Sequence, residues 1–132
     1  MTMATWDDLT FGVEIEVSGL SYAAAMQAVA GALGGLTFSG DRTARDAAGW
    51  EWKAVNDCSI SPAGCEIVTP ILRGDEDMGR LQAVVRSLRA AGAQVNDSCG
   101  LHVHVGSAGL KPAPIARLAN TVNRYEAMIE PM

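Results

Sequence analysis

Two acidic residues separated by one position form the first group that could do chemistry. Glu14 and Glu16 lie in the segment 10–18, where apolar residues alternate with polar or small ones. Such an alternation predicts a strand with one apolar face, so both carboxylates are expected on its other face. Their Cα atoms would lie roughly 7 Å apart, where like charges repel unless a cation neutralises them. The pair predicts either a site for Mg²⁺, which binds carboxylate oxygens, or a solvated strand face.

The chain has two histidines, and both lie in one short segment. His102 and His104 alternate with apolar residues in the segment 101–105, which predicts a second strand with both imidazoles on one face. A neutral imidazole binds transition metals, and a protonated one binds phosphoryl or carboxylate oxygens. A zinc site built on the pair would need a further acidic or cysteine ligand. Two surface histidines on a half-buried strand are the alternative interpretation.

A third group of polar residues lies in the middle of the chain. Glu66 stands within the apolar segment 65–69, where its side chain either joins the other charged groups or is simply exposed. Asp57 and Ser59 precede a Ser-Pro-Ala-Gly turn signal. Their side chains either form the turn or contribute to the site.

Composition limits the classes of protein to which the chain can belong. Its 132 residues are 48% hydrophobic and 19% charged, enough apolar material for one domain with a core. The net charge of −5 argues against nucleic acid as the main partner. No apolar run is long enough for a membrane span, and the chain opens without a signal-peptide pattern. Three cysteines without C-x-x-C spacing favour a reducing compartment, so we expect a cytoplasmic protein without a membrane partner.

The elements that must position these groups follow from the hydrophobic pattern. Strands are predicted at 10–18, 36–39, 50–56, 65–69 and 101–105, and helices at 22–33, 74–91 and from a Pro-rich corner to about 129. The polar segment 40–49 is predicted to be an exposed loop or hairpin tip. The pattern favours an α+β domain over residues 1–132: a largely antiparallel sheet with helices on one face and an open concave face for the charged groups. The apolar residues of the last helix are expected to point inward.

In this order along the chain, the motifs resemble those of the amidoligase family. This family looks like a distant branch of the proteins that have the glutamine synthetase and glutamate–cysteine ligase fold. The resemblance covers about residue 9 to the end, and four motifs carry it: Phe11-Gly12-Val13-Glu14-Ile15-Glu16, Asp57-x-Ser59, Gly64-Cys65-Glu66-Ile67-Val68-Thr69-Pro70 and Cys99-Gly100-Leu101-His102-Val103-His104-Val105.

The resemblance implies a role for each matching carboxylate and imidazole. Glu14 and Glu16 match the pair that holds two divalent metals, Mg²⁺ or Mn²⁺ as its substitute, and Glu66 matches a further metal carboxylate. His102 matches the histidine at the metal that is bound with the nucleotide phosphates, a site to which Glu16 also belongs. His104 matches the histidine that touches the acyl phosphate or the carboxylate substrate.

The resemblance also implies the reaction, an ATP-dependent joining of a carboxylate to an amine through an acyl phosphate. Asp57 and Ser59 match a motif for which substrate binding is the expected role. Phosphoryl transfer needs positioning and charge neutralisation rather than a protein nucleophile, which suits metals held by carboxylates. The implied partners are a small-molecule or peptide carboxylate, an amine and other copies of the chain in a homo-oligomer.

Two alternatives stay open at this point. Family members are usually about twice as long, and their second half supplies arginines and another acidic ligand. The chain is therefore expected to be a fragment, a shortened protein or a subunit completed by a partner, and a non-catalytic module used in assembly is one alternative. A metal-dependent hydrolase that holds zinc with His102, His104 and a carboxylate is the other.

Overall fold

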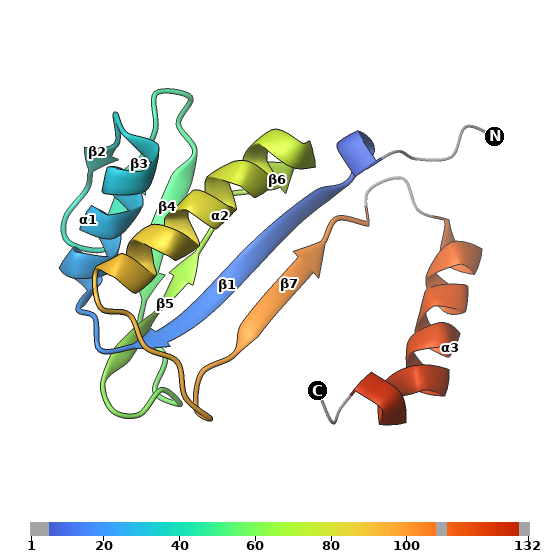
Figure 1. Cartoon of the computed structure of the whole chain (residues 1–132). Helices are drawn as coiled ribbons and strands as arrows, with labels where there is room; N and C mark the ends of the chain where they lie inside the picture. The colour runs from blue at the N-terminus through green and yellow to red at the C-terminus, as the bar shows by residue number, and fades with distance from the viewer. Residues whose placement is uncertain (1–5, 108–110, 130–132) are drawn as a thin grey trace.

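The computed structural model describes residues 6–107 and 111–129, apart from the side chains of Trp6 and of residues 127–129. Five of its strands follow one another between α1 and α2, and the other strands lie next to helices along the chain (Figure 1). They are η1 (Trp6–Asp8), β1 (Thr10–Ser18), α1 (Tyr22–Leu33), β2 (Thr37–Phe38), β3 (Thr43–Arg45), β4 (Glu51–Val55), β5 (Gly64–Val68), β6 (Leu72–Arg73), α2 (Gly74–Ala90), β7 (Leu101–Val105) and α3 (Pro112–Ile129).

The strands of the described chain form one antiparallel sheet, in which β1 pairs with strands on both of its sides. Phe11 of β1 pairs with Leu72 of β6 and also with Val105 of β7, so β6 and β7 lie on opposite sides of β1. By the same argument at Glu14, β5 lies on the side of β6. The order across the sheet is thus β2, β3, β4, then β5 with its continuation β6, then β1, with β7 at the edge.

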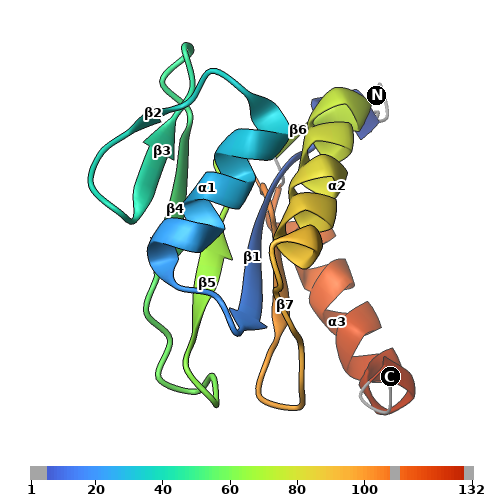
Figure 2. The same cartoon turned by 60° about the vertical axis from the view of Figure 1, so that its left-hand side comes forward.

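Helices α1 and α2 lie side by side on one face of this sheet (Figures 1 and 2). Ser21 begins α1 as the predicted N-cap, because its Oγ accepts a hydrogen bond from the Ala24 N–H at 3.3 Å. Gly34 ends the helix with φ of 68°, a conformation that favours glycine. Between helices and sheet lies the core, and its largest fully buried side chains are Trp52, Met26, Ile67, Leu72, Leu88, Val29 and Val84.

The face of the sheet opposite α1 and α2 carries no helix in the described part of the chain (Figure 2). In β5, Cys65 and Ile67 are buried towards the helices, whereas Glu66 between them is only partly buried. Period-two geometry places Glu66 on the opposite face. The prediction of an α+β fold with an antiparallel sheet, helices on one face and an open face is confirmed.

Two short strands were not predicted. Segment 40–49, predicted to be an exposed loop or hairpin tip, forms hairpin connections but also contains β3, which pairs with β2 and β4 and buries Ala44 completely. Strand β6 follows Pro70, which interrupts the pairing of β5 with β1. The side chain of Thr69 bridges this interruption, because its Oγ1 accepts a hydrogen bond from the Val13 N–H at 2.9 Å.

The last helix forms as predicted, but the expectation that its apolar residues point inward is wrong. Ile115, Leu118, Val122 and Tyr125 are all exposed, and Ile129 lies outside the described side chains. Figure 1 shows α3 beyond the outer edge of β7, away from α1 and α2. No described helix is long and apolar enough to cross a membrane.

Candidate functional site

Strand β1 carries both acidic residues of the first motif between two partner strands. Glu14 is the register partner of His102 on β7, and Glu16 is the register partner of Glu66 on β5. Cross-strand partners have Cβ atoms about 5 Å apart on one face of the sheet. The pairing therefore brings three of the predicted motifs together on the helix-free face.

Both histidines contact the same carboxylate oxygen. His102 Nδ1 and His104 Nε2 each lie 3.2 Å from Glu14 Oε2, and His102 Nε2 lies 3.8 Å from Glu16 Oε1. The hydrogen bond from His104, followed by that from His102, holds the pKa of Glu14 below its usual range despite partial desolvation. Glu14 is thus kept ionised, and the more exposed imidazoles flank it.

Glu16 is the buried member of the acidic pair, with 5% of its surface exposed. Its Oε2 accepts a hydrogen bond of 2.7 Å from the Gly100 N–H, and its own N–H donates to the Gly100 carbonyl at 3.1 Å. A Cβ on Gly100 would stand 3.1 Å from His102 Nε2 and 3.4 Å from Glu16 Oε2. Gly100 stands within the His-x-His motif, but this role was not predicted from the motif. A glycine directly before the His-x-His strand was the available signal.

Glu66 lies where several negative charges meet. Its pKa is raised, first by desolvation and then by the carboxylates of Glu14, Asp57 and Glu16. A divalent cation bound there would relieve both the repulsion and the desolvation of the charged form.

Asp57 and Ser59 do form the turn that their sequence predicted, and the turn also reaches the site. Asp57 Oδ1 accepts hydrogen bonds from the Ser59 N–H at 2.8 Å and from the Ser59 hydroxyl at 2.7 Å. These bonds hold the pKa of Asp57 below its usual range. The carboxylate stays ionised and has lone pairs left for a further ligand.

Two sets of potential ligand atoms result, and we call their five residues the acidic site. One set is Glu14, Glu66 and His102; the other is Glu16, Asp57 and Glu66. Within each set the atoms lie within 4.8 Å of one another, and Glu66 belongs to both. Carboxylate oxygens with at most one imidazole suit Mg²⁺ or Mn²⁺ better than zinc. Among the described residues, no such set contains both histidines.

A basic residue lies on the same face two strands away. Val68 of β5 pairs with Glu14 on one side and with Lys53 of β4 on the other, so Lys53 shares a cross-strand row with Glu14. Lys53 Nζ lies 2.8 Å from Glu51 Oε1, and Glu51 also binds Arg45. The helix-free face therefore changes from acidic at β1 and β5 to mixed charge at β3 and β4.

The cysteines do not take part in this geometry. Cys65 is fully buried on the helix side of β5, and burial raises the pKa of its thiol. A buried thiol with a raised pKa is a poor metal ligand and a poor nucleophile. The acidic site therefore consists of carboxylates and one imidazole, with Ser59 and His104 beside it.

Comparison with known proteins gives one match. The sequence model of a family described as "putative amidoligase enzyme" matches residues 7–131. No curated protein and no solved structure matches the chain. The matched range contains all of the residues gathered on the helix-free face, and it spans nearly the whole chain. The chain belongs to the amidoligase family.

Proposed function

We propose that this chain carries the cation-binding face of an ATP- and Mg²⁺-dependent carboxylate–amine ligase that works through an acyl phosphate. Family membership supports an amide-forming ligase. The single observation that carries the finer proposal is the sharing of Glu66 between two sets of ligand atoms. A carboxylate shared by two sets suits a pair of neighbouring cations. Two such cations would neutralise the negative charge of a nucleotide triphosphate.

The residues of the acidic site divide between the two cations. Glu14, Glu66 and His102 would hold the ion that accompanies the nucleotide phosphates, and Glu16, Asp57 and Glu66 would hold the second, which separates Glu16 from the nucleotide site that the resemblance implied for it. Bound Mg²⁺ supplies neutralisation of the charge that develops on the transferred phosphoryl group and on the leaving ADP. Gly100 and Ser59 are positioning residues, because their hydrogen bonds orient Glu16 and Asp57.

In the proposed reaction, an oxygen of the substrate carboxylate forms a bond to the γ-phosphorus while the bond from that phosphorus to ADP breaks. The amine then attacks the acyl carbon, loses a proton, and inorganic phosphate leaves. His104, with about two thirds of its side chain exposed at the rim, is placed to contact the acyl phosphate or the carboxylate. Neither step needs a covalent bond to the protein.

The test is trapping of the acyl phosphate with hydroxylamine. The protein is incubated with ATP, Mg²⁺, hydroxylamine and each free amino acid in turn, and hydroxamate and ADP are measured together. Equal amounts of both, lost in Glu66→Gln and retained in Glu76→Gln, would support the proposal. Cation and ATP binding without hydroxamate from any carboxylate would instead identify a binding module, and absence of ATP binding would overturn the proposal.

A further inference from the structure

Two apolar surfaces of the described chain face solvent. One is a groove between α2 and the strand pair β1–β7, and the other is one side of α3. Of the exposed large hydrophobic side chains in the described residues, all but Phe38 and Ile71 lie on or beside these two surfaces. They are Leu9, Val85, Val95, Leu101, Val103 and Val105 around the groove, and Ile115, Leu118, Val122 and Tyr125 on α3.

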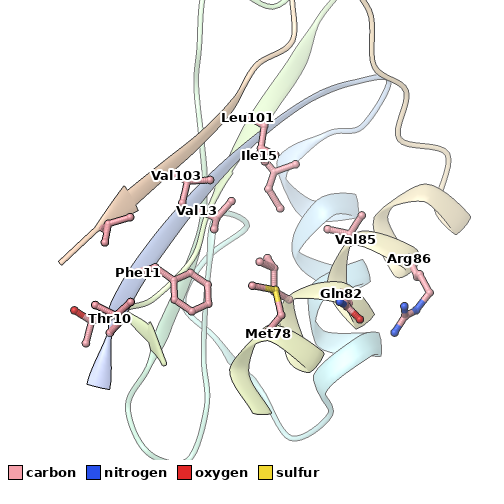
Figure 3. A pocket seen from close by; sticks show the side chains of 13 residues that line it. Thr10, Phe11, Val13, Ile15, Met78, Gln82, Val85, Arg86, Leu101 and Val103 are labelled. Atoms are coloured by element: carbon pink, nitrogen blue, oxygen red, sulfur yellow. The ribbon is translucent and has the colours of Figure 1, made fainter. Parts of the chain in front are cut away.

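The groove forms because β7, at the edge of the sheet, lies beyond the strands against which α2 packs. Side chains of β1 and β7 point towards those of α2 across an open space (Figure 3), with a volume of about 500 Å³. On β7, Leu101, Val103 and Val105 point to this side and are 58–66% exposed, while the two histidines point to the acidic site. The groove therefore offers, beside α2, an apolar surface on which a further helix could pack.

The apolar side of α3 matches this groove in residue pattern and in length. Its four apolar residues recur at intervals of three and four, which places them in one stripe. From Ile115 to Tyr125 the stripe is roughly 15 Å long at 1.5 Å per residue. The α2 residues along the groove, Met78 to Arg86, extend for roughly 12 Å by the same measure. The stripe thus covers the length of the groove.

The charged residues of the two surfaces favour one orientation of α3 in the groove. Glu126 lies at the Tyr125 end of the stripe, whereas Arg117 and Arg124 lie on the opposite side of α3 by helical periodicity. In the groove, Arg86 of α2 lies at the end of the lining α2 residues away from Met78 (Figure 3). A helix that runs parallel to α2, with Ile115 near Met78, would bring Glu126 towards Arg86.

We propose that α3 of a second copy of this chain occupies the groove, and that the exchange is reciprocal. Within one chain α3 lies beyond the outer edge of β7 and away from α2 (Figure 1), and its apolar stripe stays exposed. A second copy related by a two-fold axis covers both surfaces at once and forms a closed dimer. The groove lies on the helix side of the sheet, so this proposal does not depend on the ligase reaction.

The first test is the mass of the full chain in solution by light scattering after size exclusion. A dimer is expected for the unaltered protein, and monomers are expected for Val103→Glu and for the double variant Leu118→Glu/Val122→Glu. The matched control is Ala116→Glu/Asn120→Glu, which places two charges with the same spacing on the other side of α3 and should stay dimeric. All substituted residues are exposed, and circular dichroism checks that each variant is folded.

A mixing experiment distinguishes reciprocal exchange of α3 between two copies from docking of α3 into the groove of its own chain. Val103→Glu keeps an intact α3, and Leu118→Glu/Val122→Glu keeps an intact groove, so a mixture restores one of the two contacts. The mixture should form a heterodimer, measured by energy transfer between differently labelled copies, whereas neither variant pairs with itself. A monomeric unaltered protein, a dimer that survives Leu118→Glu/Val122→Glu, or a mixture that stays monomeric would each overturn the proposal.

Discussion

His102 of β7 and Glu14 of β1 are direct register partners, and their side chains meet at 3.2 Å between Nδ1 and Oε2. This contact links the edge strand to the strand beside it. Through Glu14 the imidazole also belongs to the same set of ligand atoms as Glu66 on β5. Three strands, far apart in sequence, thus meet in one potential cation site on the helix-free face.

The two histidines should differ in their effect on cation binding. His102 belongs to a set of ligand atoms, whereas His104 contacts Glu14 from outside both sets. We expect His102→Ala to weaken Mn²⁺ binding at least about tenfold, roughly 1.4 kcal/mol, and His104→Ala to change it less than about threefold. Isothermal titration at pH 7.5 measures both. A larger loss in His104→Ala than in His102→Ala would contradict the assignment.

Glu66 should make the stability of the metal-free protein depend on pH. Its pKa is raised by burial and by neighbouring carboxylates, so between about 4.5 and the raised value the folded state holds a proton that the unfolded state has lost. The free energy of unfolding contributed by Glu66 therefore falls as the pH rises through that window. Glu66→Gln should melt a few degrees above the unaltered protein at pH 8 in EDTA, and close to it at pH 4.

Added Mn²⁺ should reverse the order of the melting temperatures of Glu66→Gln and the unaltered protein at pH 8. With excess Mn²⁺ at pH 8, the unaltered protein gains stability from binding and Glu66→Gln gains less. Differential scanning calorimetry with and without Mn²⁺ measures both differences. If Glu66→Gln melts below the unaltered protein at pH 8 in EDTA, the ionised Glu66 side chain does not destabilise the folded state, which contradicts its raised pKa.

The second set of ligand atoms should depend on the Asp57 carboxylate rather than on the turn. Asp57→Asn keeps an oxygen that can accept the hydrogen bonds from Ser59, but it loses the negative charge. We expect it to remove one of two Mn²⁺ binding events or to weaken it by about tenfold or more. Ser59→Ala, which keeps the carboxylate, is the control and should retain both events. Equal losses in the two variants would show that the turn, not the charge, is required.

The pairing of β5 with β1 is close at Gly64, so protein stability should be sensitive to a methyl group added there. A Cβ on Gly64 would lie 2.1 Å from the Val17 carbonyl oxygen, whereas a Cβ on Gly12 would have nothing within 4 Å. Gly64→Ala should therefore lower the free energy of unfolding by about 2 kcal/mol or more, and Gly12→Ala should change it by less than about 0.5 kcal/mol. Urea denaturation followed by fluorescence measures both. Similar values for the two variants would contradict the described pairing of β1 with β5.

The sequence was sufficient to predict the elements that carry the site and the faces on which its side chains lie. Alternation fixed the direction of Glu14 and Glu16, and the apolar neighbours Cys65 and Ile67 left only the open face for Glu66. These predictions succeeded because burial of one face determines the other in a half-buried strand.

The order of strands across the sheet could not be predicted in the same way. Nothing local in the segment 101–105 states that β7 pairs with β1 rather than with another strand, and the contact between His102 and Glu14 depends on that pairing. Strand β3 was missed because Ala44 is its only buried residue, so the segment has no alternation to detect. The stripe on α3 showed that a helix face needs a partner, but periodicity does not say which partner.

Mn²⁺ binding to three forms of the full chain tests the central claim most directly. They are the unaltered protein, Glu14→Gln/Glu66→Gln, and the control Asp41→Asn/Glu76→Gln, which loses the same charge from exposed acidic residues outside the acidic site. Titration followed by the electron paramagnetic resonance signal of free Mn²⁺ should show binding by the unaltered protein and the control, and loss of at least about tenfold in affinity in Glu14→Gln/Glu66→Gln. Equal binding by all three forms, or none by any, would contradict a cation site on the helix-free face.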